Sequence, residues 1–239
     1  MNNLGRLIKG EFQRLFKYNI FQVGLGLSIL WVLVLFLVGD EGAELFVPIF
    51  IFMDITLMTV LLIGASLFYE RQENTLKTLL ITPVKLSHVI FSKLLSAIYI
   101  AFQSTVIISV FAVLFFDLEV NLPLLFAFAV IVACAHAMIG FMFAVWLKDF
   151  ASLLAAMMTY MIIFAFPSIF YAFGILGETF ETLLIFSPTH ASLLLIDKAF
   201  YVEVSIGLIS VGVVYLIVLS YLLGRYLVFP KYIEKAIEG

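Results

Sequence analysis

Six apolar runs, each about 20 residues or longer, constrain this 239-residue chain more than any other feature. A helix needs about 20 predominantly apolar residues to cross the hydrocarbon core of a bilayer. Backbone groups inside that core must pair with one another, so each run is expected to be a helix. We therefore predict an all-α, polytopic membrane protein with one domain, residues 1–239. The predicted spans are Ile20–Val38, Leu45–Phe68, Ile90–Phe116, Leu122–Leu147, Ala151–Phe173 and Val204–Leu227.

The scarcity of charge agrees with a location in the membrane. Charged residues make up 12% of the chain and apolar residues 64%, whereas an ordinary soluble domain has about 25% charged residues. So few charges cannot cover a soluble exterior, which excludes a cytosolic enzyme, a nucleic-acid-binding protein and a disordered chain. The single cysteine, Cys134, excludes a disulfide framework and a multi-cysteine metal site. The first apolar run follows a long charged stretch, so we do not expect a cleaved signal peptide.

The basic residues predict the orientation of the spans, because Lys and Arg concentrate on the cytoplasmic side of a membrane. Twelve of the 13 basic residues lie in the N-terminal segment, the loop after the second run, the turn after the fourth run and the C-terminal tail. The remaining one, Lys198, lies on the other side together with nine acidic residues. Both termini are therefore expected in the cytoplasm, which requires an even number of spans.

Three segments outside the spans carry further predictions. Residues 1–19 place apolar and basic side chains on opposite faces at helical spacing, which predicts an amphipathic helix in the cytoplasmic interface. Glu11 falls inside the apolar arc and indicates a contact with protein, although a simple membrane anchor is the alternative. Residues 69–89 form the longest cytoplasmic loop, which is either a docking element or a polar turn. Residues 174–203 are apolar but broken by Gly177 and Pro188, which predicts short helices that re-enter the outer leaflet.

A few polar or helix-breaking residues lie within the runs. Asp54 is the one acidic residue at membrane depth, so we expect it to face protein or a wet cavity, or to be protonated. It is either a substrate-path or proton-relay residue or a hydrogen-bonded tie between helices. His136 and Cys134 are two residues apart and would point in nearly opposite directions on a helix, so packing is favoured and no metal site is predicted. Pro167 is expected to kink or break the fifth span.

No enzyme signature occurs in the sequence. The HExxH motif, the GxSxG motif and the phosphate-binding loop GxxxxGK[ST] are all absent, and the dipeptide Gly-Lys does not occur. The chain is therefore not expected to be an enzyme or to hold a cofactor. If the protein uses ATP, another polypeptide must bind it.

The order of these segments resembles the permease subunits of ABC-2-type transporters, which have the type V exporter fold. The loop after the second span begins Glu70-Arg71-Gln72-Glu73-Asn74-Thr75-Leu76 and continues to Leu79-Leu80-Ile81-Thr82-Pro83. It is similar to the family's coupling-helix pattern E-R-E-x-G-T-L-x-x-L-L-x-T-P, with Gln72 in place of an acid and Asn74 in place of glycine. Ser187-Pro188-Thr189-His190 is similar to the element that follows the family's outer re-entrant helices.

The resemblance implies that the chain is a subunit of an exporter and that a separate ATPase subunit supplies the energy for transport. ABC ATPase subunits would bind ATP and Mg²⁺ and seat on the coupling helix between the second and third spans. The candidate coupling residues are Glu70, Arg71, Glu73, Asn74, Thr75, Leu76, Leu79, Leu80, Thr82 and Pro83. The path would follow spans two and five and be completed by a second permease copy or a paralogue. Its candidate residues are Asp54, Met58 and Pro167, with Pro188 and His190 in the outer re-entrant element.

The resemblance also implies a substrate class and a location. The substrate would be a hydrophobic or amphipathic drug, peptide, lipid or lipid-linked glycan, and the protein would lie in a prokaryotic plasma or inner membrane without a nucleic-acid partner. Three alternatives stay open. They are a haem-exporter-type permease, a proton-coupled secondary transporter that uses Asp54, and a membrane-embedded interaction or immunity protein without transport.

Overall fold

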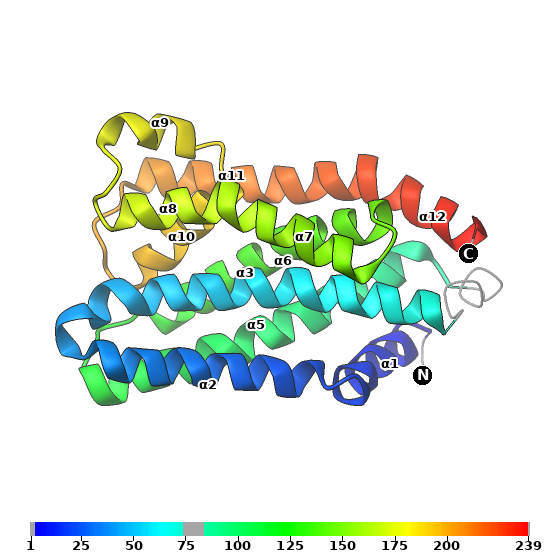
Figure 1. Ribbon diagram of the computed structural model, residues 1–239, viewed down its shortest axis with the longest axis horizontal. Coiled ribbons are helices and arrows are strands. Elements are labelled where there is room, and N and C mark those ends of the chain that lie inside the picture. Colours follow the sequence, from blue (N-terminus) through cyan, green and yellow to red (C-terminus); the bar gives the residue numbers. More distant parts are fainter. Residues whose placement is uncertain (1–2, 74–83, 239) are drawn as a thin grey trace.

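All regular secondary structure in the described part of the chain is helical. The computed structural model describes residues 3–73 and 84–238. Within these residues, six helices are long and apolar enough to cross a membrane. They are Ile20–Val38, Asp40–Gln72, Leu86–Phe116, Leu122–Trp146, Phe150–Ala172 and Ile206–Tyr232. The predicted all-helical architecture with six candidate spans is therefore confirmed, and Figure 1 shows these helices packed side by side in a bundle.

The first half of the chain forms five long elements. Helix α1 (Asn3–Lys17) leads into α2 (Ile20–Val38), and Gly39 alone separates α2 from α3 (Asp40–Gln72). Gly39 has a φ of 74°, a left-handed conformation that favours glycine, and this allows the chain to reverse direction within one residue. Helices α5 (Leu86–Phe116) and α6 (Leu122–Trp146) follow.

The second half of the chain is more divided. It comprises α7 (Phe150–Tyr160), the π-helical turn η1 (Met161–Ala165), α8 (Phe166–Ala172), η2 (Glu178–Phe180), α9 (Glu181–Leu184), α10 (Pro188–Ala199), α11 (Ile206–Leu222), the π-helical turn η3 (Leu223–Val228) and α12 (Phe229–Glu238). The short helices η2, α9 and α10 occupy the segment 174–203, where short helices were predicted. Figure 1 shows α9 and α10 at the end of the bundle opposite the two chain termini.

Of the kink or break predicted at Pro167, the break is not present. Pro167 lies in the first turn of α8, where the lack of a backbone N–H is tolerated. The π-helical turn η1 directly precedes α8, so the helix widens there instead of ending. The fifth span therefore continues from Phe150 to Ala172.

Helices α3 and α6 form the centre of the bundle. Most side chains of both spans are buried, whereas the last span and α2 are largely exposed, as expected for helices that face lipid. The two central backbones approach closely at Gly140. A Cβ atom at this position would lie 2.9 Å from Cα and from the carbonyl oxygen of Val60. Glycine at position 140 therefore permits this close approach of α6 to α3.

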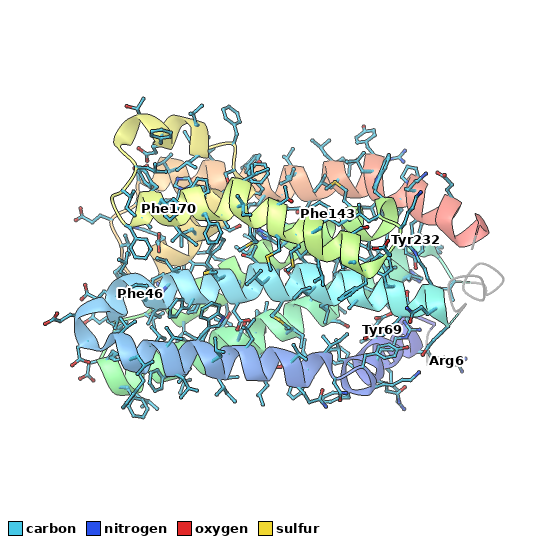
Figure 2. All side chains as sticks on the ribbon, viewed as in Figure 1. Arg6, Phe46, Tyr69, Phe143, Phe170 and Tyr232 are labelled. Atoms are coloured by element: carbon cyan, nitrogen blue, oxygen red, sulfur yellow. The ribbon has the colours of Figure 1, made fainter. Side chains whose placement is uncertain are left out.

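The bundle has two chemically different ends. Figure 2 shows Tyr69 and Tyr232 toward the end that holds both termini, and Phe46 and Phe170 toward the opposite end. We call the first the basic end, because eleven of the twelve basic residues in the described part of the chain lie in its segments, residues 3–17, 69–73, 84–93, 148 and 225–238. We call the opposite end, which holds Gly39, residues 117–121 and residues 174–205, the acidic end.

Candidate functional site

Four ionised side chains meet at the basic end, between the end of α3 and the beginning of α5. Glu11 and Arg14 come from α1, Glu70 from α3 and Lys93 from α5, and we call these four residues the ionic cluster. Glu11, Glu70 and Lys93 are 4%, 0% and 1% exposed. Charged residues are almost never buried this completely unless they are paired.

The Lys93 ammonium lies at the centre of the cluster. Its Nζ atom lies 2.6 Å from Oε1 of Glu70 and 3.2 Å from Oε1 of Glu11, and it donates to the Ser66 hydroxyl at 2.8 Å. The Arg14 guanidinium pairs with the same two carboxylates, at 2.7 Å from Oε1 of Glu11 and in close contact with Glu70. Two cations and two anions thus balance each other, and the cluster ties α1, α3 and α5 together.

Local sequence spacing explains how the helices present these groups. Ser66 and Glu70 are four residues apart, so they share one face of α3 and both meet Lys93. Glu11 and Arg14 are three residues apart on α1, next to the buried side chain of Leu15. Burial alone would lower the pKa of the Arg14 guanidinium, but the carboxylates of Glu70 and Glu11 outweigh this effect and raise it. Arg14 therefore stays charged.

A more exposed pair lies beside the cluster and joins the same helices. Lys17 of α1 donates to the Glu73 carboxylate at 2.8 Å. This hydrogen bond raises the pKa of Lys17 and lowers the pKa of Glu73. The rings of Tyr18 and Tyr69 stack with their centroids 4.4 Å apart. The last turn of α3 is thus attached to α1 by both charged and aromatic contacts.

Arg71 attaches the same turn of α3 to α6. Its guanidinium donates to the carbonyl oxygen of Leu147 at 3.2 Å and to that of Ala144. The last carbonyls of a helix lack partners within the helix, so Arg71 acts as a cap for the end of α6. The neighbours Glu70 and Arg71 therefore hold the end of α3 to three other helices.

The predicted coupling residues fall into two groups. Glu70, Arg71 and Glu73 are described and make the contacts above. Asn74, Thr75, Leu76, Leu79, Leu80, Thr82 and Pro83 lie outside the described residues. The protein contact predicted for Glu11 is present.

Lys93 is the residue that sequence reasoning missed. It was counted among the charges of the loop after the second span, but the structure places it inside α5 and buries it. The available signal was its position, three residues inside the predicted span Ile90–Phe116, since a lysine there needs a partner.

Asp54 and Met58 lie inside the bundle, between α2 and α3. Asp54 is fully buried and accepts a hydrogen bond from the Ser28 hydroxyl at 2.7 Å. Met58 is also buried, and its terminal methyl group lies 3.4 Å from where a Cβ atom of Gly24 would be. Asp54 thus faces protein, as predicted, and neither residue borders the two cavities described next.

Two cavities in the described part of the bundle border the residues predicted for the outer re-entrant element, Pro188 and His190. An apolar groove of about 470 Å³ runs between α6, the fifth span and α11, where Phe143, Phe164 and Leu219 contribute to its walls. The side chains of Tyr160 and Tyr215 border the groove, and Pro188 closes one part of it. A second cavity, of about 490 Å³, lies at the acidic end and is bordered by His190. We call it the acidic-end cavity.

His136 forms a tie between helices. Its Nδ1 atom lies 3.0 Å from the carbonyl oxygen of Val132, and its Nε2 atom lies 3.2 Å from the hydroxyl of Tyr160. Both ring nitrogens therefore have a hydrogen-bond partner within the bundle. In residues 3–73 and 84–238, no group of three or more His, Cys, Asp or Glu side chains is arranged to hold a metal ion.

No protein-family model matches the chain, and no curated protein matches it.

Proposed function

We propose that the chain is the transmembrane subunit of an ATP-driven exporter of the ABC-2 type. It has no ATP site of its own and depends on separate ATPase subunits that dock on residues 69–89. The basic end, with both termini, faces the cytoplasm of a prokaryotic cell, and α1 lies along that membrane surface. A second copy of the chain or a paralogue completes the pathway.

The observation that carries the proposal is that the last turn of α3, where the coupling-helix pattern Glu70–Pro83 begins, is bound to other helices. Glu70, Arg71 and Glu73 begin the motif, and all three hold the last turn of α3 to other helices. Lys93 anchors the beginning of α5 to the same point. A displacement of the last turn of α3 would therefore move α1, α3, α5 and α6 together. A coupling element needs such a rigid connection to transmit movement from an ATPase to the spans.

The apolar groove supports the substrate class. Small-molecule sites are mostly apolar clefts of about 300–1,000 Å³ with a few polar groups, and the groove has about 470 Å³ of space and two tyrosines at its edge. It therefore suits a hydrophobic or amphipathic molecule. The fifth span forms one wall of the groove through Thr159, Tyr160 and Phe164, whereas the predicted path residue Pro167 does not border it.

Co-purification tests the coupling assignment. The full chain is expressed with candidate ATPases from the same genome, and the complex is isolated through a tag on the chain. We expect Leu79→Arg or Glu73→Lys to abolish recovery of the ATPase, because both changes alter the docking segment. Leu183→Arg is the matched control, since Leu183 is exposed on α9 at the acidic end. If Leu79→Arg and Glu73→Lys recover as much ATPase as the control Leu183→Arg and the wild type, residues 69–89 do not couple to an ATPase.

Transport by the chain alone tests the proton-coupled alternative. The complete burial of Asp54 at membrane depth is the observation that favours it. In liposomes that contain only this protein and carry a pH gradient, we expect no transport. Uptake that is abolished by Asp54→Asn would favour the alternative and overturn the exporter proposal.

A further inference from the structure

The acidic-end cavity combines an acidic border with a buried histidine. Its volume is about 490 Å³, and it lies between the beginning of α3, α8, α10 and the beginning of α11. Figure 1 shows these elements at the end of the bundle opposite the termini. Four carboxylates border it, from Glu44, Glu181, Asp197 and Glu203.

No basic side chain of the described residues neutralises this border. Within residues 3–73 and 84–238, none of the four carboxylates forms an ion pair with a basic side chain. Lys198 follows Asp197 on α10 but does not border the cavity. Glu44 and Glu203 are exposed, whereas Glu181 and Asp197 are partly buried. The carboxylates therefore line the cavity from its rim inward, and their combined field attracts a positive charge.

His190 supplies a second, independent observation. It borders the cavity, is 2% exposed, and neither ring nitrogen has a hydrogen-bond partner among the described residues. A buried polar group without a partner is costly. Burial lowers the pKa of His190 to about 4, so the ring is neutral at pH 7. A neutral imidazole offers one acceptor and one donor, which fits a ligand with a polar N–H group.

The other residues that border the cavity indicate the chemistry of the rest of the ligand. Ile49, Leu193 and Leu208 give the cavity apolar surface, and the ring of Tyr171 meets that of His190 edge to face, with centroids 5.5 Å apart. Burial raises the pKa of Asp197 to about 7, and a bound cation would favour its ionised form. A metal ion fits poorly, because no metal-binding arrangement exists in the described part of the chain. An organic cation with an apolar group can pair with the carboxylates and also pack against the apolar side chains of the cavity.

We infer that the acidic-end cavity binds a cationic amphiphile, a primary ammonium joined to an apolar group, with the ammonium among the carboxylates and in contact with the imidazole of His190. The site faces the side opposite the proposed ATPase contact. Binding requires neither an ATPase nor transport, so the inference stands or falls separately from the proposed function.

A fluorescent ligand tests this inference on the purified full-length chain. The chain is placed in phosphatidylcholine nanodiscs, whose lipids carry no net charge, and titrated with monodansylcadaverine, a primary ammonium linked to an apolar fluorophore. We expect saturable binding, and at least tenfold weaker binding of the N-acetyl derivative, which lacks the positive charge. Equal binding of the two ligands, or signal no greater than that of empty nanodiscs, would overturn the inference.

Variants locate the binding to this cavity. We expect Asp197→Asn and His190→Phe each to weaken binding about tenfold, the size of one lost charge-assisted hydrogen bond. His190→Gln retains a donor and an acceptor and is expected to stay within threefold of the wild type. Glu119→Gln is the matched control, because Glu119 is an exposed carboxylate of the acidic end that does not border the cavity. If Glu119→Gln and Asp197→Asn weaken binding equally, the ligand responds to the general surface charge, and the proposed site in the cavity is refuted.

Discussion

Replacing Lys93 with methionine tests the physical basis of the ionic cluster most directly. The substitution preserves most of the side-chain volume and removes only the ammonium. Two buried carboxylates, Glu11 and Glu70, are then left to share the Arg14 guanidinium. We therefore expect Lys93→Met to reduce the free energy of unfolding strongly.

The distances set the size of the effect. At an effective dielectric constant of about 20, the Lys93 ammonium gains about 6 kcal/mol from Glu70 and about 5 kcal/mol from Glu11. Desolvation of the buried ammonium offsets a large part of this gain. Breaking a buried ion pair by removal of one partner costs about 3–5 kcal/mol, and we expect a loss in this range.

A second substitution separates charge balance from packing. In the double variant Lys93→Met with Glu11→Leu, the remaining pair of Arg14 and Glu70 is again neutral. Buried ion pairs can often be replaced by apolar residues at little cost, so we expect the double variant to be more stable than Lys93→Met alone. Lys17→Met removes an exposed lysine that pairs with Glu73 and should change stability little, which makes it the control.

Unfolding in mixed detergent micelles measures these differences. The purified chain is titrated with SDS, and unfolding is followed by the fluorescence of its two tryptophans, Trp31 and Trp146. If Lys93→Met lies within about 1 kcal/mol of the wild type, well below the cost of a broken buried pair, the cluster does not stabilise the basic end. If the two substitutions destabilise additively, charge balance is not the cause.

Three further predictions concern other contacts. Gly140→Ala should destabilise the bundle by about 1–3 kcal/mol in the same titration, because its Cβ atom would press on Val60, whereas Gly26→Ala, which meets no atom within 4 Å, should be neutral or stabilising. Arg71→Met should lower stability by about 1.5–3 kcal/mol through loss of its hydrogen bonds to α6, and unchanged stability would contradict the capping role. Asp197→Asn should stabilise the chain at pH 8 but not at pH 4. Burial raises the pKa of Asp197 from 3.8 to about 7, so the wild-type protein loses stability as the pH rises from 3.8 to 7, up to about 4 kcal/mol, and the asparagine variant does not. A difference in melting temperature that is the same at both pH values would exclude this cause.

The spans could be predicted because their signal is local. Length and hydropathy decide whether a segment can cross a bilayer, and the predicted run Ile20–Val38 coincides with α2. Helix α3, from Asp40 to Gln72, extends beyond the run Leu45–Phe68 at both ends, since a helix can continue into polar surroundings where hydropathy no longer marks it. The boundaries were therefore less predictable than the spans.

The ionic cluster could be predicted only in part, because its contacts are long-range. Glu11 stood out as an acid on the apolar side of a helix, which indicates a partner without identifying it. That partner, Lys93, is 82 residues away, and no local pattern connects the two. Lys93 was counted with the charges of the loop although it lies within the predicted span Ile90–Phe116, and its ion pairs with Glu11 and Glu70 make that buried position possible.

The attachment of α1 has a consequence for how the protein behaves during membrane preparation. A helix held to the surface only by anionic headgroups detaches in 1 M salt, where the Debye length falls to about 3 Å. The pair of Glu11 and Lys93, which holds α1 to α5, is shielded from solvent ions, because both side chains are almost completely buried. High-salt washing should therefore leave α1 as resistant to proteolysis as it is at low salt. In this respect the N-terminal helix behaves as an integral part of the bundle, although its sequence has the composition of a peripheral anchor.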